Sequence, residues 1–281
     1  MLARMKTRLA FSTARWFSCL ALLAVFASPT VTAQDWAKAL LDKSPRHQEW
    51  VKVTHGSRTV DAFVVYPEVS HKAPVVLLIH EIFGLSDWAR SMADDIAAMG
   101  YIVIAPDLLS GFGPNGGNTS AFADQQAVIK AVSSLDPETV TADLNAAADY
   151  ALKLPAASGK LAVIGFCWGG GKSFLYATQR HSLNAAFVFY GPPPPTDSMK
   201  NIAAPVYGFY AGNDARITAT VPDTKTAMAA AGKKYDTVIY DGAGHGFMRA
   251  GEDPTITGYN FANVFGRTDS LKRIESLLKG M

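Results

Sequence analysis

The chain has 281 residues, of which 49% are hydrophobic and 18% are charged, and its formal net charge is +2. This composition is typical of a packed globular protein and excludes a disordered one. Part of the positive charge belongs to Arg4, Lys6, Arg8 and Arg15, so the remainder is nearly neutral and has no basic stripe that would bind nucleic acid.

The first 33 residues have the pattern of a secretory signal peptide. The basic residues precede an apolar run from Trp16 to Phe26, and small residues follow up to Ala33, where we expect cleavage. The run is too short for an ordinary transmembrane helix, so we expect no stable membrane insertion after cleavage and a periplasmic or secreted protein. An uncleaved anchor is the alternative. A lipoprotein is disfavoured because Cys19 lies inside the apolar run.

Cleavage would leave Cys167 as the sole cysteine of the mature chain, because the sequence has two. A structural disulfide within the chain is then impossible, and an unpaired cysteine in an exported protein is a candidate reactive thiol. The alternative is a small buried hydrophobic residue, which is the usual role of a free cysteine.

Residues 34–281 are predicted to form a single α/β domain. Two segments that alternate apolar and polar residues, Trp50–Val53 and Thr59–Val65, predict an antiparallel pair of strands. Continuous apolar runs predict buried parallel strands at Pro74–Ile79, Tyr101–Ala105, Leu161–Gly165, Ala185–Tyr190, Val206–Tyr210 and Thr237–Tyr240. Helical patterns lie at Asp87–Met99, Phe122–Val132, Thr139–Leu154, Trp168–Arg180, Ala219–Ala231 and Asp269–Lys279. This alternation predicts a mainly parallel sheet with helices on both faces.

Two loops that follow predicted strands are rich in turn residues, Ser110–Ser120 and Gly191–Pro195. Binding sites in open α/β sheets lie at the carboxyl ends of the strands, so both loops are candidates for the walls of a site. Ordinary surface loops are the alternative.

The strongest local motif is Gly165-Phe-Cys167-Trp-Gly169, which joins a predicted buried strand to a predicted helix. This is the nucleophile-elbow pattern with Cys in place of Ser. Side chains at the two glycines would collide with a neighbouring strand or helix. A position at a helix N-terminus would favour the thiolate, and the N–H of Trp168 would face a developing oxyanion. A phosphate-binding loop is disfavoured because Phe166 stands where that motif needs Gly.

An elbow nucleophile is followed along the chain by an acid and then by a histidine. His245 lies in a Gly-rich loop after a predicted strand, whereas His181 lies at the far end of the elbow helix. Asp214 follows the strand between nucleophile and histidine, and it is the candidate that fixes the histidine tautomer. Asp223 and Asp236 are weaker candidates because of their places beside a helix and before a strand.

The strand that ends at Ile79 leads into His80-Glu81-Ile82-Phe83-Gly84. In elbow enzymes this loop supplies the second oxyanion donor, here the N–H of Ile82, which places Glu81 close to the thiol. A zinc motif would need His at position 84, and no other cluster has ligand spacing. We therefore expect no metal and no cofactor.

Four segments together resemble the dienelactone hydrolases, also called carboxymethylenebutenolidases, over roughly residues 51–281. They are His80–Gly84, Gly165–Gly169, Gly212–Asp214 and Gly244–Arg249. The resemblance implies the α/β-hydrolase fold, with Cys167 as nucleophile, His245 as base and Asp214 as its partner. It further implies that Glu81 pairs with the resting thiol and that Arg249 binds a substrate carboxylate.

The sequence departs from the family pattern at one substrate-binding residue. The family has a second carboxylate-binding arginine before the nucleophile, but no arginine lies between Arg90 and Arg180 here. Gln125, Gln126 and Lys130 lie near that place. The resemblance therefore implies the chemistry more firmly than an anionic substrate.

These observations predict cysteine-dependent hydrolysis of a small-molecule ester or lactone through a thioester intermediate. A catalytically silent binding protein with the same fold is the alternative. A thiol-redox protein is disfavoured because no resolving cysteine is present. Oligomeric state has no signature in the sequence.

Overall fold

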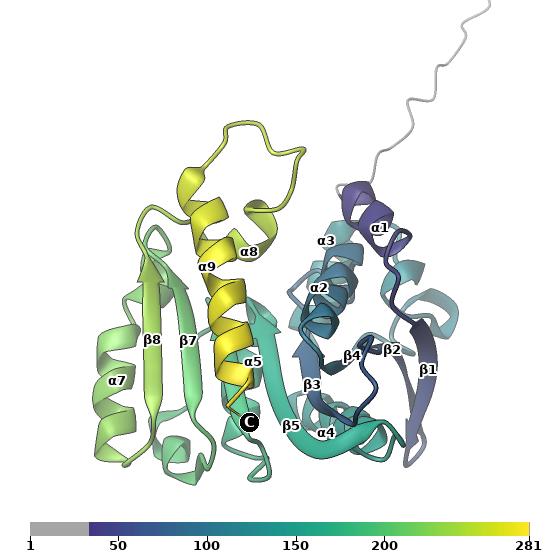
Figure 1. Cartoon of the computed structure of the whole chain (residues 1–281), viewed down its shortest axis with the longest axis horizontal. Coiled ribbons are helices and arrows are strands. Elements are labelled where there is room, and N and C mark those ends of the chain that lie inside the picture. The colour runs from purple at the N-terminus through teal and green to yellow at the C-terminus, as the bar shows by residue number, and fades with distance from the viewer. Residues whose placement is uncertain (1–33, 281) are drawn as a thin grey trace, which may run out of the picture. The chain divides into compact units, whose positions relative to one another are not determined.

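A computed structural model describes residues 34–280, so the predicted signal peptide lies outside the described residues. Its centre is an eight-stranded sheet in the order β1-β2-β4-β3-β5-β6-β7-β8 (Figure 1). The strands are β1 (Gln48–His55), β2 (Arg58–Val65), β3 (Ala73–Ile79), β4 (Ile102–Pro106), β5 (Ala157–Phe166), β6 (Ala185–Phe189), β7 (Val206–Ala211) and β8 (Tyr235–Tyr240). β1 pairs antiparallel with β2, and β2 with β4, while β3 to β8 pair in parallel. The predicted mainly parallel sheet with an antiparallel start is confirmed.

Helices cover both faces of the sheet (Figure 1). They are α1 (Asp35–Leu41), α2 (Asp87–Ala98), α3 (Gln125–Ser133), α4 (Pro137–Leu152), α5 (Trp168–Ala177), α6 (Ala215–Thr218), α7 (Val221–Ala230), α8 (Phe247–Ala250) and α9 (Phe261–Leu278). Within the described part of the chain, none is long and apolar enough to cross a bilayer.

Successive residues of the inner parallel strands point into different cores, which explains their continuous apolar runs. Leu78 of β3 belongs to a core that includes Trp88 of α2 and Ile274 of α9. Its neighbour Leu77 belongs to a second core that includes Leu144 of α4. Strands β3 to β7 are therefore buried on both faces, whereas the predicted buried strand Thr237–Tyr240 is wrong in its burial, because β8 lies at the edge of the sheet and Ile239 is exposed.

Two helix predictions were wrong in their boundaries. The segment Ala219–Ala231 contains one helix, α7, which begins two residues later than predicted, at Val221, with a proline in its first turn, and the short helix α6 before it was not predicted. The last helix begins eight residues before the predicted Asp269, at Phe261, where the Asn260 side chain accepts a hydrogen bond from the Ala262 N–H.

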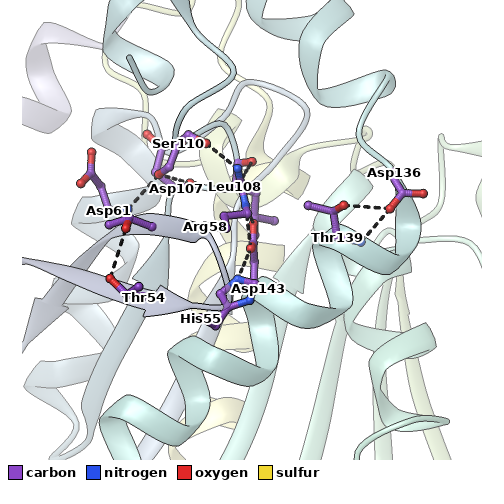
Figure 2. A network of polar contacts seen from close by, with 11 residues as sticks. Thr54, His55, Arg58, Asp61, Asp107, Leu108, Ser110, Asp136, Thr139 and Asp143 are labelled. Atoms are coloured by element: carbon purple, nitrogen blue, oxygen red, sulfur yellow. Dashed lines mark hydrogen bonds and ion pairs between the residues drawn. The ribbon is translucent and has the colours of Figure 1, made fainter. Parts of the chain in front are cut away.

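The loop after β4 is anchored by a buried polar network (Figure 2). Nε of Arg58 lies 2.8 and 2.9 Å from the carboxylate oxygens of Asp143, which is 1% exposed. The same guanidinium donates to the carbonyls of Leu108 at 3.2 Å and Ser110 at 2.8 Å. His55 adds a contact of 2.7 Å to Asp143. The start of the Ser110–Ser120 loop is thereby fixed to β2 and α4.

Candidate active site

Cys167 occupies the sharp turn between β5 and α5. Its backbone has φ 56° and ψ −115°, a region that non-glycine residues rarely adopt. A Cβ on Gly165 would lie 2.0 Å from the carbonyl oxygen of Gly169. A Cβ on Gly169 would lie 2.4 Å from the carbonyl oxygens of Ile79 and His80. The predicted collisions are confirmed, and the glycines are what permit the turn.

A hydrogen-bonded chain connects the thiol to a buried carboxylate. Nε2 of His245 lies 3.0 Å from Sγ of Cys167, and Nδ1 of His245 lies 2.5 Å from Oδ2 of Asp214. Asp214 is 8% exposed and lies three residues after the end of β7. Burial acts to lower the pKa of His245, but the hydrogen bonds to Cys167 and Asp214 outweigh it and raise the pKa to about 9.

The structure thus brings together the three residues that the sequence placed in the order nucleophile, acid, histidine. The weaker candidates His181, Asp223 and Asp236 are all exposed.

Glu81 contacts a different partner from the one that the family resemblance implied. Its buried carboxylate accepts a hydrogen bond from Nε of Arg249 at 3.0 Å and a long one, 3.5 Å, from the hydroxyl of Tyr190. The contact of the thiol is with His245 instead. Burial raises the pKa of Glu81, although the Arg249 charge opposes this. The guanidinium is already engaged by a carboxylate.

The two predicted oxyanion donors, the N–H groups of Ile82 and Trp168, belong to residues that pack against the same apolar cluster. Ile82 follows β3 and Trp168 follows the elbow, and both side chains pack against the same small apolar cluster around Val128. Among the hydrogen bonds of residues 34–280, none is donated by the backbone N–H of Ile82 or Trp168. The ring of His80 stacks on Trp168 with centroids 5.6 Å apart.

Tyr190, which follows β6, was not among the predicted site residues. Its φ is 38°, its side chain is fully buried, and its ring lies 5.1 Å from that of His245. The prediction treated this tyrosine as the last residue of an apolar strand, and nothing local distinguishes it from a core residue.

A cavity of about 540 Å³, here called the side cavity, lies beside the loop that carries Ile82. Residues 118–120 of the Ser110–Ser120 loop form part of its wall. Its other walls include Trp50, Phe83, Leu85, Phe122, Gln125 and Val128. The proline-rich loop Gly191–Pro195 instead lines a smaller cavity of about 260 Å³ with Trp168 and Lys172.

Residues 60–279 match the sequence model of the dienelactone hydrolase family. The chain belongs to this family. A protein of Methylorubrum extorquens that is provisionally named a carboxymethylenebutenolidase is 33% identical over 210 residues, which cover 70% of this chain and 71% of the relative. A relative of the same provisional name from Salmonella typhi is 34% identical over 199 residues, covering 66% and 72% of the two chains.

A crystal structure of a provisionally named dienelactone hydrolase from Klebsiella pneumoniae matches with a TM-score of 0.72 at 27% identity, covering 84% of this chain and 99% of that one. This dienelactone hydrolase family member is therefore an enzyme of the carboxylic ester and lactone hydrolase class, with the α/β-hydrolase fold. The predictions of family, fold and enzyme class are confirmed.

Proposed function

We propose that the enzyme cleaves an ester or lactone with Cys167 as nucleophile, His245 as base and Asp214 as the group that orients the base. The observation that carries this proposal is the continuous contact from Sγ through the imidazole to a buried carboxylate, with distances of 3.0 and 2.5 Å. The elbow at Cys167 adds support, since a strained backbone at a reactive side chain is typical of functional sites.

The reaction has two steps. In the first, His245 takes the thiol proton, sulfur bonds to the substrate carbonyl carbon, and the N–H groups of Ile82 and Trp168 stabilise the oxyanion. The carbon–oxygen bond then breaks, and His245 returns the proton to the leaving oxygen. In the second step, His245 deprotonates water, which attacks the thioester and releases the acid and the thiol.

The environment of His245 suits this role. Asp214 and Cys167 raise the pKa of His245 to about 9 against the effect of burial, so the imidazole holds a proton strongly once it has taken it from the thiol. Asp214 stabilises the imidazolium by its charge.

Glu81 and Arg249 respond to the charge of the substrate in this proposal. A substrate carboxylate would have to displace Glu81 from Nε of Arg249. The released Glu81 would then be a buried carboxylate without a cation, and it would accept a proton readily because burial raises its pKa.

The test is to trap the thioester. Wild type and Cys167→Ala are mixed with p-nitrophenyl acetate, quenched in acid and weighed by mass spectrometry. We expect one acetyl group on the wild type, removed by hydroxylamine, and neither adduct nor turnover in Cys167→Ala. His245→Ala should abolish acetylation while keeping the fold. Turnover that survives in Cys167→Ala would refute the thiol mechanism, and a folded wild type without any turnover would favour the silent binding protein.

We also propose that residues 1–33 direct export to the periplasm or the medium, and that the mature enzyme begins at Gln34. N-terminal sequencing of the enzyme recovered from the periplasm of a bacterial host tests this. A chain lacking residues 2–33 is the control and should stay in the cytoplasm. An enzyme recovered with its first residues intact from the membrane fraction would indicate an uncleaved anchor.

A further inference from the structure

The side cavity is large enough for a ring-bearing group, and its walls combine six apolar residues with polar ones. Trp50, Phe83 and Phe122 contribute aromatic rings, and Leu85 and Val128 contribute aliphatic groups. Cavities of this size and lining are typical of sites for small organic molecules.

Among the described residues that line the cavity, none offers an unpaired cation to a ligand. One cationic and three acidic side chains line it. The cation, Arg90, forms an ion pair with Asp87, and its guanidinium lies 5.7 Å from the ring of Trp50. Asp124 accepts from the Ala127 N–H at the start of α3. A carboxylate placed here would meet more negative than positive charge.

The third acid, Asp107, forms hydrogen bonds within the wall of the cavity. Its carboxylate accepts hydrogen bonds from the backbone N–H of Thr119 at 3.0 Å and from the Thr119 hydroxyl at 2.7 Å. Oγ1 of Thr119 in turn accepts from the Leu85 N–H at 3.2 Å. Asp107 therefore ties the loop after β4 to the loop that carries Ile82.

The base of this loop is held by the network around Arg58 (Figure 2). The hydroxyl of Ser110 donates to the Asp107 carbonyl at 2.6 Å and accepts from the Asp61 N–H at 2.9 Å. The side chain of Asn118 donates to Asp61 at 2.9 Å. Because these partners lie within the protein, the cavity wall is formed before any ligand binds.

One short segment, residues 81–85, contacts both the side cavity and the residues around Cys167. Phe83 lines the cavity, and its ring lies 5.0 Å from the guanidinium of Arg249, which bonds to Glu81. The side chain of Ile82 packs in the cluster with Val128, a cavity residue. The cavity and the Cys167 site therefore lie against the same five-residue segment, 81–85.

We propose that the side cavity binds an uncharged aromatic or alicyclic substituent of the substrate, so that the enzyme selects bulky neutral esters or lactones. This proposal rests on the proposed function. Apolar walls stabilise the ring, while the acidic side chains and the paired Arg90 disfavour an anion.

Binding to the Cys167→Ala variant tests the preference without turnover. The probes are methyl 2-naphthoate and its acid, 2-naphthoate, which share one ring system and differ in charge. Calorimetry should show at least about tenfold tighter binding of the ester, the order expected from burial of a ring without an opposing charge. Equal affinities, or tighter binding of the acid, would overturn the proposal.

Two neighbouring glutamines give matched variants that locate the binding. Gln125 lines the cavity and Gln126 does not, and both are exposed on α3. In the Cys167→Ala background, Gln125→Trp should weaken binding of methyl 2-naphthoate about tenfold, and Gln126→Trp should leave it unchanged. Gln125→Arg should strengthen binding of 2-naphthoate about tenfold, unlike Gln126→Arg. Equal effects at the two positions in both pairs would place the ligand elsewhere.

Failure of this proposal is distinguishable from failure of the proposed function. The thiol mechanism is tested by the thioester and by turnover in wild type, whereas the cavity is tested by affinities in a variant without the thiol. Wild-type turnover of p-nitrophenyl acetate with no difference between Gln125 and Gln126 variants would refute the cavity assignment alone.

Discussion

Removal of the Arg249 guanidinium should destabilise the fold through Glu81. The Glu81 side chain is 3% exposed, and Arg249 is its one cationic partner among the ion pairs of the described residues. The remaining contact, with the Tyr190 hydroxyl, is 3.5 Å long. Arg249→Met keeps an aliphatic side chain beside Phe83 but leaves a buried carboxylate without a countercharge.

The size of the effect follows from burial. Breaking a buried ion pair by removal of one partner costs about 3–5 kcal/mol. The Arg249 side chain is 26% exposed, so water can partly replace it, and we expect a loss of about 2–3 kcal/mol. For a domain of this size that corresponds to a fall in Tm of about 4–12 °C.

The loss should depend on pH with a definite sign. Burial raises the pKa of Glu81 and Arg249 opposes the rise, so the variant should have a still higher pKa in the folded state. A carboxyl group with a raised folded-state pKa destabilises the protein fully above that pKa, and this cost shrinks as the pH falls below it and vanishes below the unfolded-state pKa. The deficit of Arg249→Met should therefore be largest at neutral pH and shrink as the pH falls toward 5.

Thermal unfolding followed by circular dichroism at pH 7.5 and pH 5 measures both effects. Addition of Glu81→Gln to Arg249→Met should restore most of the lost stability at pH 7.5, because the amide carries no charge. Arg216→Met, at an exposed position on α6, is the matched control and should change Tm by less than about 2 °C. A deficit that Glu81→Gln does not relieve, or that is the same at both pH values, would refute the argument.

Two further predictions concern the base and the elbow. Asp214→Asn should lower the pKa of His245, because the carboxylate raises it, and thiol alkylation by iodoacetamide should shift its pH midpoint accordingly. An unchanged midpoint would contradict the role of Asp214. Gly165→Ala should prevent folding or lower stability by about 3 kcal/mol, because its Cβ would meet the Gly169 carbonyl at 2.0 Å. Gly244→Ala is its control, since the nearest atom to its Cβ would be 4.0 Å away, and urea unfolding should separate the two.

The contacts from Cys167 through His245 to Asp214 could be predicted from the sequence, because each of these residues has a local signature. The glycines around Cys167 are part of a known motif because larger side chains would collide there. Asp214 and His245 follow predicted strands, and the carboxyl ends of parallel strands meet at one edge of the sheet. Strand pairing then brings Asp214 and His245 together without any further information.

The surroundings of these three residues could not be predicted, because they depend on contacts between residues that are distant in the sequence. Glu81 and Arg249 are 168 positions apart, and the family resemblance implied a different partner for the carboxylate, the thiol. The side cavity likewise depends on Asp107 and Thr119, whose contact is set by the path of the loop after β4. A Gly- and Pro-rich loop has no periodic pattern from which that path could be read.

The position of Cys167 is set by backbone atoms rather than by side chains. The Cys167 N–H donates to the Phe189 carbonyl at 3.0 Å, and a Cβ on Gly170 would lie 2.3 Å from that same carbonyl oxygen. A Cβ on Gly191 would lie 2.2 Å from the N atom of Gly171. The close packing of the end of β6 against the turn at Cys167 therefore stabilises the strained backbone of that turn. Gln125 of the side cavity lies outside this set of backbone contacts, so we expect its substitution to change which ester is bound, as proposed above, while the thiol stays in place.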